Sequence, residues 1–137
     1  MIDFIIYDTL GRIFQTGSCQ SELLQEQITM VPTHAGMFVM GGAAKQDTQY
    51  ISSGIVTDRL TQPTTLNKLT LTADGIDTIT LSNAPSGTFT ATNTTTRETV
   101  TGAINGTDSF LTTIQGTYKI RIESWPFLDF EATINAL

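Results

Sequence analysis

The clearest pattern in the chain is Thr117-Tyr118-Lys119-Ile120-Arg121-Ile122-Glu123. Its apolar side chains fall on one side of an extended backbone, and its charged side chains fall on the other side. A strand with one buried face and one solvated face shows this period of two. The segment 127–134 repeats the pattern, with Leu128, Phe130, Ala132 and Ile134 as its apolar positions. These two segments predict neighbouring half-buried strands.

Between Lys68 and this segment, further short strand candidates alternate with turn residues. Asn105-Gly106 is the strongest turn signal because both residue types tolerate a positive φ. Tyr118 follows Gly116, where it is either a tyrosine corner or an ordinary core tyrosine. Short strands at this density predict an immunoglobulin-like β-sandwich over residues 68–137. The predicted strands are 68–72, 77–82, 87–93, 98–104, 108–113, 117–123 and 127–134.

The first part of the chain has a different texture. Residues 2–7 and 12–16 predict a hairpin, and residues 49–57 predict a second one. Ser18 is placed to cap a short helix over residues 19–27. We therefore expect a mainly β protein. It has a small N-terminal α+β or β-rich unit (1–60), an extended linker around Pro63 (61–67) and the sandwich (68–137).

Composition excludes several classes of protein. The chain has 137 residues with 7 Lys+Arg and 13 Asp+Glu, so its net charge of −6 argues against a binder of nucleic-acid phosphates. Its 26 threonines favour strands. Apolar runs are much shorter than the ~20 residues of a membrane span, so we expect none. The residues after Met1 lack the pattern of a signal peptide, and we expect synthesis in the cytoplasm.

Residues with catalytic or metal-binding chemistry are few. His34 is the only His and Cys19 the only Cys, which leaves too few ligands for a zinc site and no motif for a nucleophile with its base. Asp74 and Asp77 flank a Gly, so they either bind calcium or form an ordinary turn before a strand. We expect no enzyme activity, no catalytic residue, no metal and no cofactor.

Candidate interface residues come from two places. The N-terminal unit has runs of consecutive apolar residues, which imply burial on both faces of a strand and hence docking to a partner. In the C-terminal part, Trp125 and Phe127 either form an interface or close one end of the sandwich. The candidate interface residues are Phe4, Ile6, Met37, Phe38, Met40, Trp125 and Phe127.

Two resemblances accompany these patterns. Thr72-Ala73-Asp74-Gly75-Ile76-Asp77-Thr78-Ile79-Thr80-Leu81 resembles the opening of bacterial immunoglobulin-like repeats of the invasin type, which occur in adhesins and in tailed-phage virion proteins. A second resemblance is to small phage structural proteins encoded near tail genes, and it is carried by segments 7–13, 16–19, 47–51, 54–59 and 118–130 together with Gln25.

The resemblance implies a non-enzymatic structural component of a tailed-phage virion, in the tail or the head–tail region, assembled in the host cytoplasm. Its implied partners are other virion proteins and further copies of itself in a symmetric particle. Two alternatives remain open. One is a decoration or cement protein on the capsid. The other is an immunoglobulin-like binding module that contacts carbohydrate or protein on the host surface.

Overall fold

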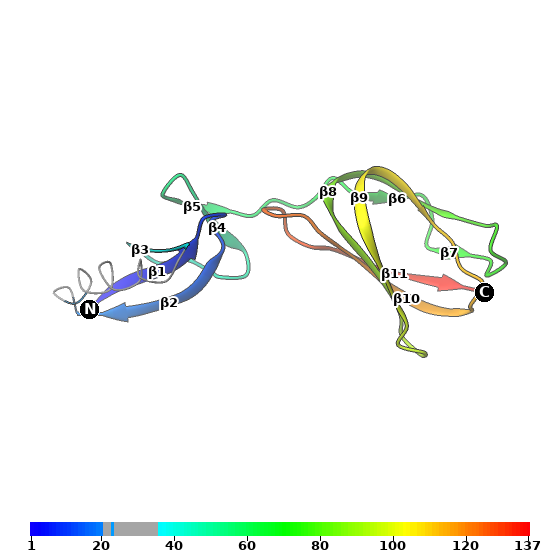
Figure 1. Cartoon of the computed structure of the whole chain (residues 1–137), viewed down its shortest axis with the longest axis horizontal. Coiled ribbons are helices and arrows are strands. Elements are labelled where there is room, and N and C mark those ends of the chain that lie inside the picture. The colour runs from blue at the N-terminus through cyan, green and yellow to red at the C-terminus, as the bar shows by residue number, and fades with distance from the viewer. Residues whose placement is uncertain (21–22, 24–35) are drawn as a thin grey trace. The chain divides into compact units, whose positions relative to one another are not determined.

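The computed structural model describes residues 1–20, 23 and 36–137. The chain divides into two compact units, unit 1 (Met1–Arg59) and unit 2 (Leu60–Leu137) (Figure 1). Both units are built from β-strands, so the expected mainly β architecture is confirmed. The division falls next to the end of the predicted N-terminal unit.

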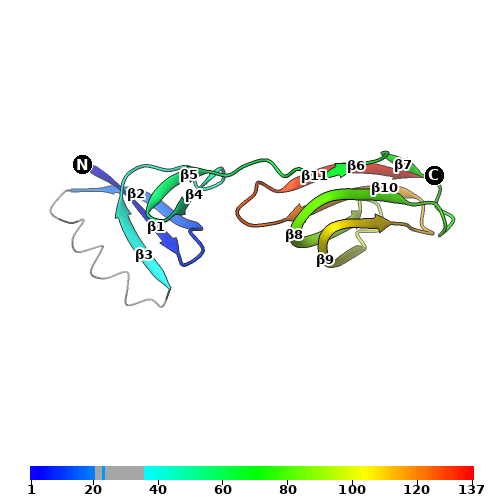
Figure 2. The same cartoon turned by 90° about the horizontal axis from the view of Figure 1, so that it is seen from above.

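Unit 1 contains an antiparallel three-stranded sheet in the order β2–β1–β3 and a separate two-stranded hairpin, β4–β5 (Figure 2). The β1–β2 and β4–β5 pairings confirm the two predicted hairpins. The strands are β1 (Ile2–Asp8), β2 (Ile13–Cys19), β3 (Met37–Gly41), β4 (Gln49–Ser52) and β5 (Ile55–Asp58).

The structure does not support the helical part of the expected α+β unit. Cys19, the first residue of the predicted helix, is the last residue of β2 and pairs with Ile2 of β1. The antiparallel ladder therefore continues through the position where a helix was expected to begin. Residues 21–22 and 24–27 of that prediction lie outside the described residues.

The β1–β2 turn is held by Asp8. Its carboxylate accepts hydrogen bonds from the backbone N–H groups of Leu10 and Arg12, both at 2.9 Å, and pairs with the Arg12 Nε at 2.8 Å. Gly11 then brings the turn against β4, because the N–H of Ile51 donates to the Gly11 carbonyl at 2.9 Å. A Cβ on Gly11 would lie 2.0 Å from the Ile51 carbonyl oxygen, so only glycine fits here. Ile51 thereby completes a small core with Ile5 and Ile13.

Unit 2 has two long strands where short ones were predicted. The predicted strands 77–82 and 87–93 are one strand, and 98–104 and 108–113 are another. The strand predicted at 127–134 begins later, at Phe130. The strands are β6 (Thr65–Leu66), β7 (Thr70–Leu71), β8 (Ile79–Asn93), β9 (Thr99–Phe110), β10 (Gly116–Glu123) and β11 (Phe130–Ala136).

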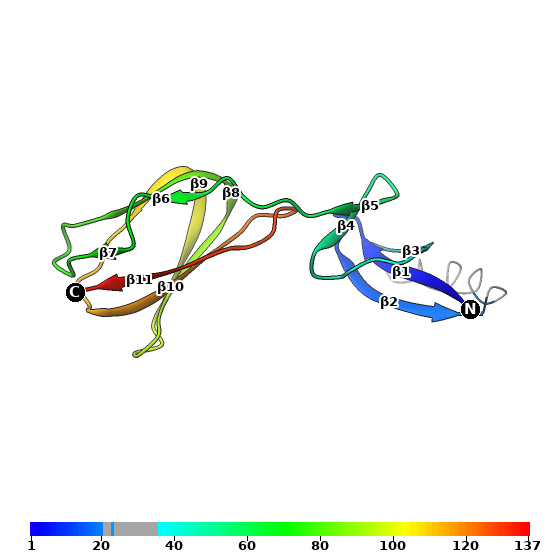
Figure 3. The same ribbon diagram turned by 180° about the vertical axis from the view of Figure 1, so that it is seen from behind.

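Irregular register between Leu81 and Gly87 divides β8 into two parts with different neighbours. The first part pairs with β6 and with the end of β9, whereas the second part pairs with β10 and with the start of β9. β10 in turn pairs with β11, and β11 pairs in parallel with β7. β8 and β9 are strongly curved (Figure 3). The result is a sandwich-like arrangement in which both long strands contribute to two layers.

The core of unit 2 lies between these layers. Tyr118, Ile120 and Ile122 of β10 are all buried, as their alternation predicts. The Tyr118 hydroxyl donates to the Ile114 carbonyl at 2.8 Å and lies 2.9 Å from the Thr112 hydroxyl. A hydrogen bond back to the backbone a few residues upstream is the contact that a tyrosine corner makes.

The predicted linker 61–67 is instead part of unit 2. Gln62 is buried, and its side-chain amide donates to the carbonyls of Ile122 at 2.8 Å and Leu128 at 3.0 Å. Its own carbonyl oxygen accepts a hydrogen bond from the Thr64 hydroxyl at 2.9 Å. Residues 65–66 then pair with β8 as β6. The polar side chains of residues 61–67 are typical of a solvated connector, but Gln62 and Thr64 form these three hydrogen bonds inside unit 2.

Candidate interaction surfaces

The apolar residues predicted for docking by unit 1 lie on both faces of the β2–β1–β3 sheet. Phe38 and Met40 of β3 pair with Tyr7 and Ile5 of β1, so they share the face that carries the Ile5 core. The opposite face carries the other three residues of the predicted set, which are Phe4, Ile6 and Met37. The structure therefore divides the predicted set into two groups.

Burial distinguishes the members of this set. Phe4 is buried, and its ring lies over Gly17, where a Cβ would be only 2.8 Å from the ring. Ile6, Met37 and Met40 are half-buried. Phe38 is 43% exposed, and its ring centroid lies 5.5 Å from that of Tyr7. Phe38 is therefore the most accessible residue of the predicted set.

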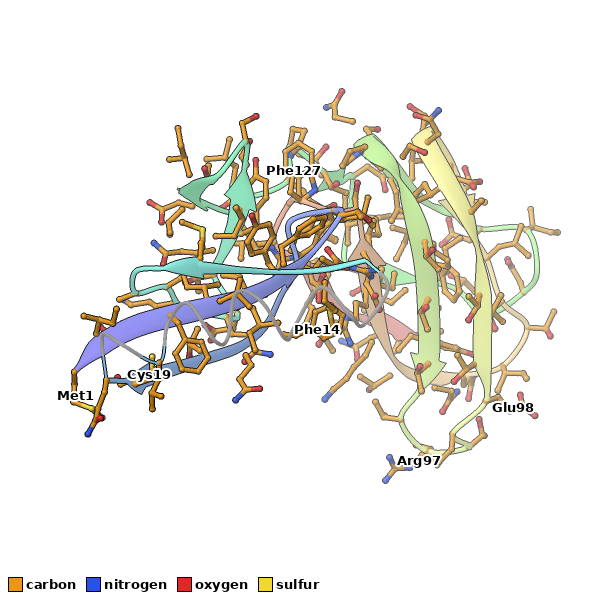
Figure 4. The ribbon with its side chains drawn as sticks, turned by 60° about the vertical axis from the view of Figure 1, so that its left-hand side comes forward. Met1, Phe14, Cys19, Arg97, Glu98 and Phe127 are labelled. Atoms are coloured by element: carbon orange, nitrogen blue, oxygen red, sulfur yellow. The ribbon has the colours of Figure 1, made fainter. Side chains whose placement is uncertain are left out.

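Phe14 is an accessible aromatic residue that the sequence interpretation missed. It lies on β2, where the register with β1 shifts between Ile6 and Tyr7, and its ring is 51% exposed (Figure 4). A β-bulge can turn a side chain outward in this way. The available signal was the adjacent apolar pair Ile13-Phe14, because successive strand residues point to opposite faces.

Trp125 and Phe127 lie in the connection between β10 and β11 and are half-buried. The predicted strand 127–134 places Phe127 on the face opposite its apolar positions, but β11 starts at Phe130, so Phe127 precedes the strand. The connection is anchored by Ser124, whose hydroxyl donates to the Ser86 carbonyl at 2.7 Å. Trp125 and Phe127 are thus held at one end of unit 2, and Figure 4 labels Phe127.

The outer face of β8, β10 and β11 forms a concavity of about 630 Å³, which is lined by charged and hydroxyl side chains together with Ile120 and Ala132. Cross-strand pairing sets Arg121 between Thr90 and Glu131, and Lys119 between Thr92 and Thr133. Arg121 also forms an ion pair with Asp129, and this contact raises the pKa of the guanidinium group. Hydroxyls, ammonium and guanidinium groups and carboxylates therefore line one surface, which suits hydrogen bonding to a polar ligand.

Asp74 and Asp77 form a turn. Asp74 Oδ1 accepts the N–H groups of Ile76 and Asp77, both at 2.8 Å, and these bonds lower the pKa of Asp74. Asp77 pairs with Lys68 at 2.6 Å and accepts the Thr72 N–H at 2.8 Å, which lowers its pKa. Three of the four carboxylate oxygens that a calcium ion could use here are engaged with the chain itself. The geometry is that of the turn alternative.

The two remaining candidate groups are Cys19 and His34. Cys19 is half-buried at the end of β2, and His34 lies outside the described residues. Within the described part of the chain, no three His, Cys, Asp or Glu side chains are grouped to hold a metal ion. The same residues contain no helix of the length and apolarity that crossing a membrane requires.

Neither the models of protein families nor the curated proteins contain a match to this chain.

Proposed function

We propose that the protein is a non-enzymatic structural component of a tailed-phage virion, located in the tail or the head–tail region. Unit 1 docks onto neighbouring virion proteins, and unit 2 is an immunoglobulin-like domain. The chain is made in the host cytoplasm and is present in several symmetric copies. A decoration protein on the capsid would use the same surfaces, and its position in the particle distinguishes the two.

One observation carries the docking role, namely that large apolar side chains are exposed among the described residues of unit 1. Among its described residues, the buried apolar side chains are Phe4, Ile5, Ile13 and Ile51. A unit of about 60 residues forms only a marginal core when it folds alone. Its most exposed aromatic residues are Phe14 and Phe38. Burial of such side chains against a partner contributes free energy that the unit alone does not obtain.

The immunoglobulin-like assignment of unit 2 is supported by its connections. β6, the first part of β8 and the end of β9 correspond to strands A, B and E of such a domain. The second part of β8, β10 and β11 correspond to strands C, F and G. The bond from Tyr118 to Ile114 occurs at the equivalent of the E–F corner.

The virion assignment is supported by the resemblance of both units to small phage structural proteins. The Asp74-Gly75 turn, where the invasin-type resemblance lies, opens the first part of β8. Segments 7–13 and 16–19 contain the β1–β2 turn and parts of both strands. Segments 47–51 and 54–59 contain most of the β4–β5 hairpin.

The test is incorporation into particles assembled in a host that lacks any other copy of the chain. We expect the wild-type chain to sediment with the particles at a fixed number of copies. The double variant Phe14→Ser/Phe38→Ser is expected to remain unbound, while Leu111→Ser, at an exposed apolar site of unit 2, is incorporated normally. Circular dichroism of each free variant checks that it is folded.

Two results would contradict the proposal. If the wild-type chain does not sediment with the particles, the virion role is wrong. If the double variant is incorporated as well as Leu111→Ser, docking does not use the exposed aromatic residues of unit 1. The Trp125 and Phe127 end of unit 2 would then be the next surface to change.

A second candidate function is favoured by the concavity on the outer face of β8, β10 and β11. As a binding module, this face would contact carbohydrate or protein on the host surface through Lys119, Arg121 and the threonines beside them. Binding of the full chain to a panel of host-surface glycans tests this function. Specific binding that Lys119→Ala abolishes would favour the module, whereas no binding to any glycan would remove carbohydrate as the ligand.

A further inference from the structure

The free strand edges of unit 2 differ in length. Residues 60–137 are described without a gap, so all the edges of this unit can be compared. The edge strands β6 and β7 are two residues long. The end of β9 pairs with β8 only over residues 108–110. The start of β9, residues 99–104, is six residues long and has β8 as its only strand neighbour.

Natural proteins protect sheet edges with short strands, charged side chains or proline. Unit 2 has short strands at three of its edges, but residues 99–107 contain no charge and no proline. Arg97 and Glu98 precede this segment at the tip of the β8–β9 hairpin (Figure 4). Val100 is 63% exposed although it pairs with Ala91 of the core. This edge is therefore unprotected and partly apolar.

The ladder shows which backbone groups of this edge point outward. The N–H of Asn93 donates to the carbonyl of Glu98 at 2.9 Å, so these two residues form a hydrogen-bonded position. Such positions recur at every second residue of an antiparallel pair. On the other side of β8, the N–H of Thr94 donates to the Thr117 carbonyl at 2.9 Å. Alternate residues of β8 therefore bond to β9 and to β10, which agrees with the position of the Asn93–Glu98 bond. The residues whose N–H and C=O groups point away from β8 are therefore Thr99, Thr101 and Ala103.

We infer that unit 2 pairs with a second copy of itself through residues 99–104 of β9. The two strands run antiparallel about a two-fold axis at Thr101, which makes one continuous sheet. The outward-pointing residues are symmetric about this position, so about six N–H···O bonds form. This pairing goes beyond the proposed docking of unit 1 and does not depend on it.

The side chains favour a second copy as the occupant. In this register Val100 lies opposite Gly102 of the other copy, and the two valines are diagonal neighbours on one face. Nothing lies within 4 Å of a Cβ built on Gly102, so the space beside it is open. The exposed Val100 side chains can therefore pack on each other. Because both edges are uncharged, they do not repel each other despite the net charge of the chain.

The experiment is sedimentation velocity of the full chain over a wide range of concentration. A six-residue edge makes a small interface, so we expect a reversible, weak dimer that forms as concentration rises. Ala103→Pro removes an outward N–H without removing a bond to β8, and it is expected to abolish the dimer at unchanged thermal stability. Val100→Lys is expected to abolish it too. Thr88→Lys adds the same charge on the neighbouring strand β8 and is expected to leave it intact.

An experiment in which two variants are mixed tests whether a second copy of the chain occupies this edge. Val100→Lys and Val100→Glu are each expected to be monomeric, and an equimolar mixture is expected to recover the dimer because the two side chains become oppositely charged diagonal neighbours. A wild-type chain that stays monomeric at every concentration would overturn the inference and leave this edge to another protein. A dimer that persists in Ala103→Pro would also overturn it and place self-association on another surface, with the Phe14/Phe38 double variant as the direct check.

Discussion

Removal of the Gln62 side chain should destabilise unit 2 strongly, although sequence alone makes this residue part of a linker. In Gln62→Ala the buried carbonyl of Ile122 and the part-buried carbonyl of Leu128 each lose a donor, and the Thr64 hydroxyl loses its acceptor. An unsatisfied buried polar group costs about 1–3 kcal/mol. We therefore expect the free energy of unfolding to fall by about 2–4 kcal/mol.

The assay is urea unfolding of the full chain followed by tryptophan fluorescence. Trp125 is the only tryptophan and lies in unit 2, so its signal reports on this unit. Gln115→Ala, at an exposed position, is the matched control and should change the stability by less than about 0.5 kcal/mol. If Gln62→Ala is no less stable than this control, residues 60–64 do not belong to the folded unit.

Three further predictions concern other contacts. Tyr118→Phe removes the hydrogen bond to the upstream carbonyl and should lower the stability of unit 2 by about 1–2 kcal/mol in the same assay. Gly87→Ala puts a Cβ 2.2 Å from a β10 carbonyl oxygen and should cost at least about 2 kcal/mol, whereas Gly102→Ala has open space and should cost less than half as much. Partial burial acts against ionisation of Asp8, but hydrogen bonds from the backbone and side chain of Arg12 outweigh it and lower the pKa of Asp8. Asp8 therefore stabilises unit 1 above the ordinary pKa of an aspartate, and this contribution is lost as the pH falls through the lower, folded-state value. Asp8→Asn should remove that part of the acid sensitivity in thermal unfolding, and an unchanged pH profile would contradict the assignment.

The local patterns of the sequence predict the strands well where one face is buried. Tyr118, Ile120 and Ile122 are all inside, because a period of two leaves one choice of face. The same patterns fail at Pro85-Ser86-Gly87, which lies at the break between the predicted strands 77–82 and 87–93, because β8 continues through it with irregular register. A bend that moves a strand from one layer to the other uses the same residue types as a turn, so composition does not distinguish the two.

Long-range contacts account for the other differences. Gln62 bonds to carbonyls some 60 residues away, and no local signal marks such a partner. Cys19 is in a strand because Ile2 lies opposite it in the ladder. Consecutive apolar residues indicate a candidate docking set, but they do not reveal that Phe4 is covered while Phe14 is turned outward. Exposure of an apolar side chain depends on tertiary packing, and sequence patterns indicate only its possible faces.

The parallel pairing of β7 with β11 also determines how unit 2 resists a mechanical load. A pulling force applied between Leu60 and Leu137 drags these two strands past each other in opposite directions along their length. Three hydrogen bonds then bear the load together: Asn135 N–H to Leu69, Leu137 N–H to Leu71, and Ala73 N–H to the Leu137 carbonyl. Bonds loaded in shear are stretched at the same time, so these three resist such a force together once the contacts of residues 60–66 with the rest of unit 2 have been released.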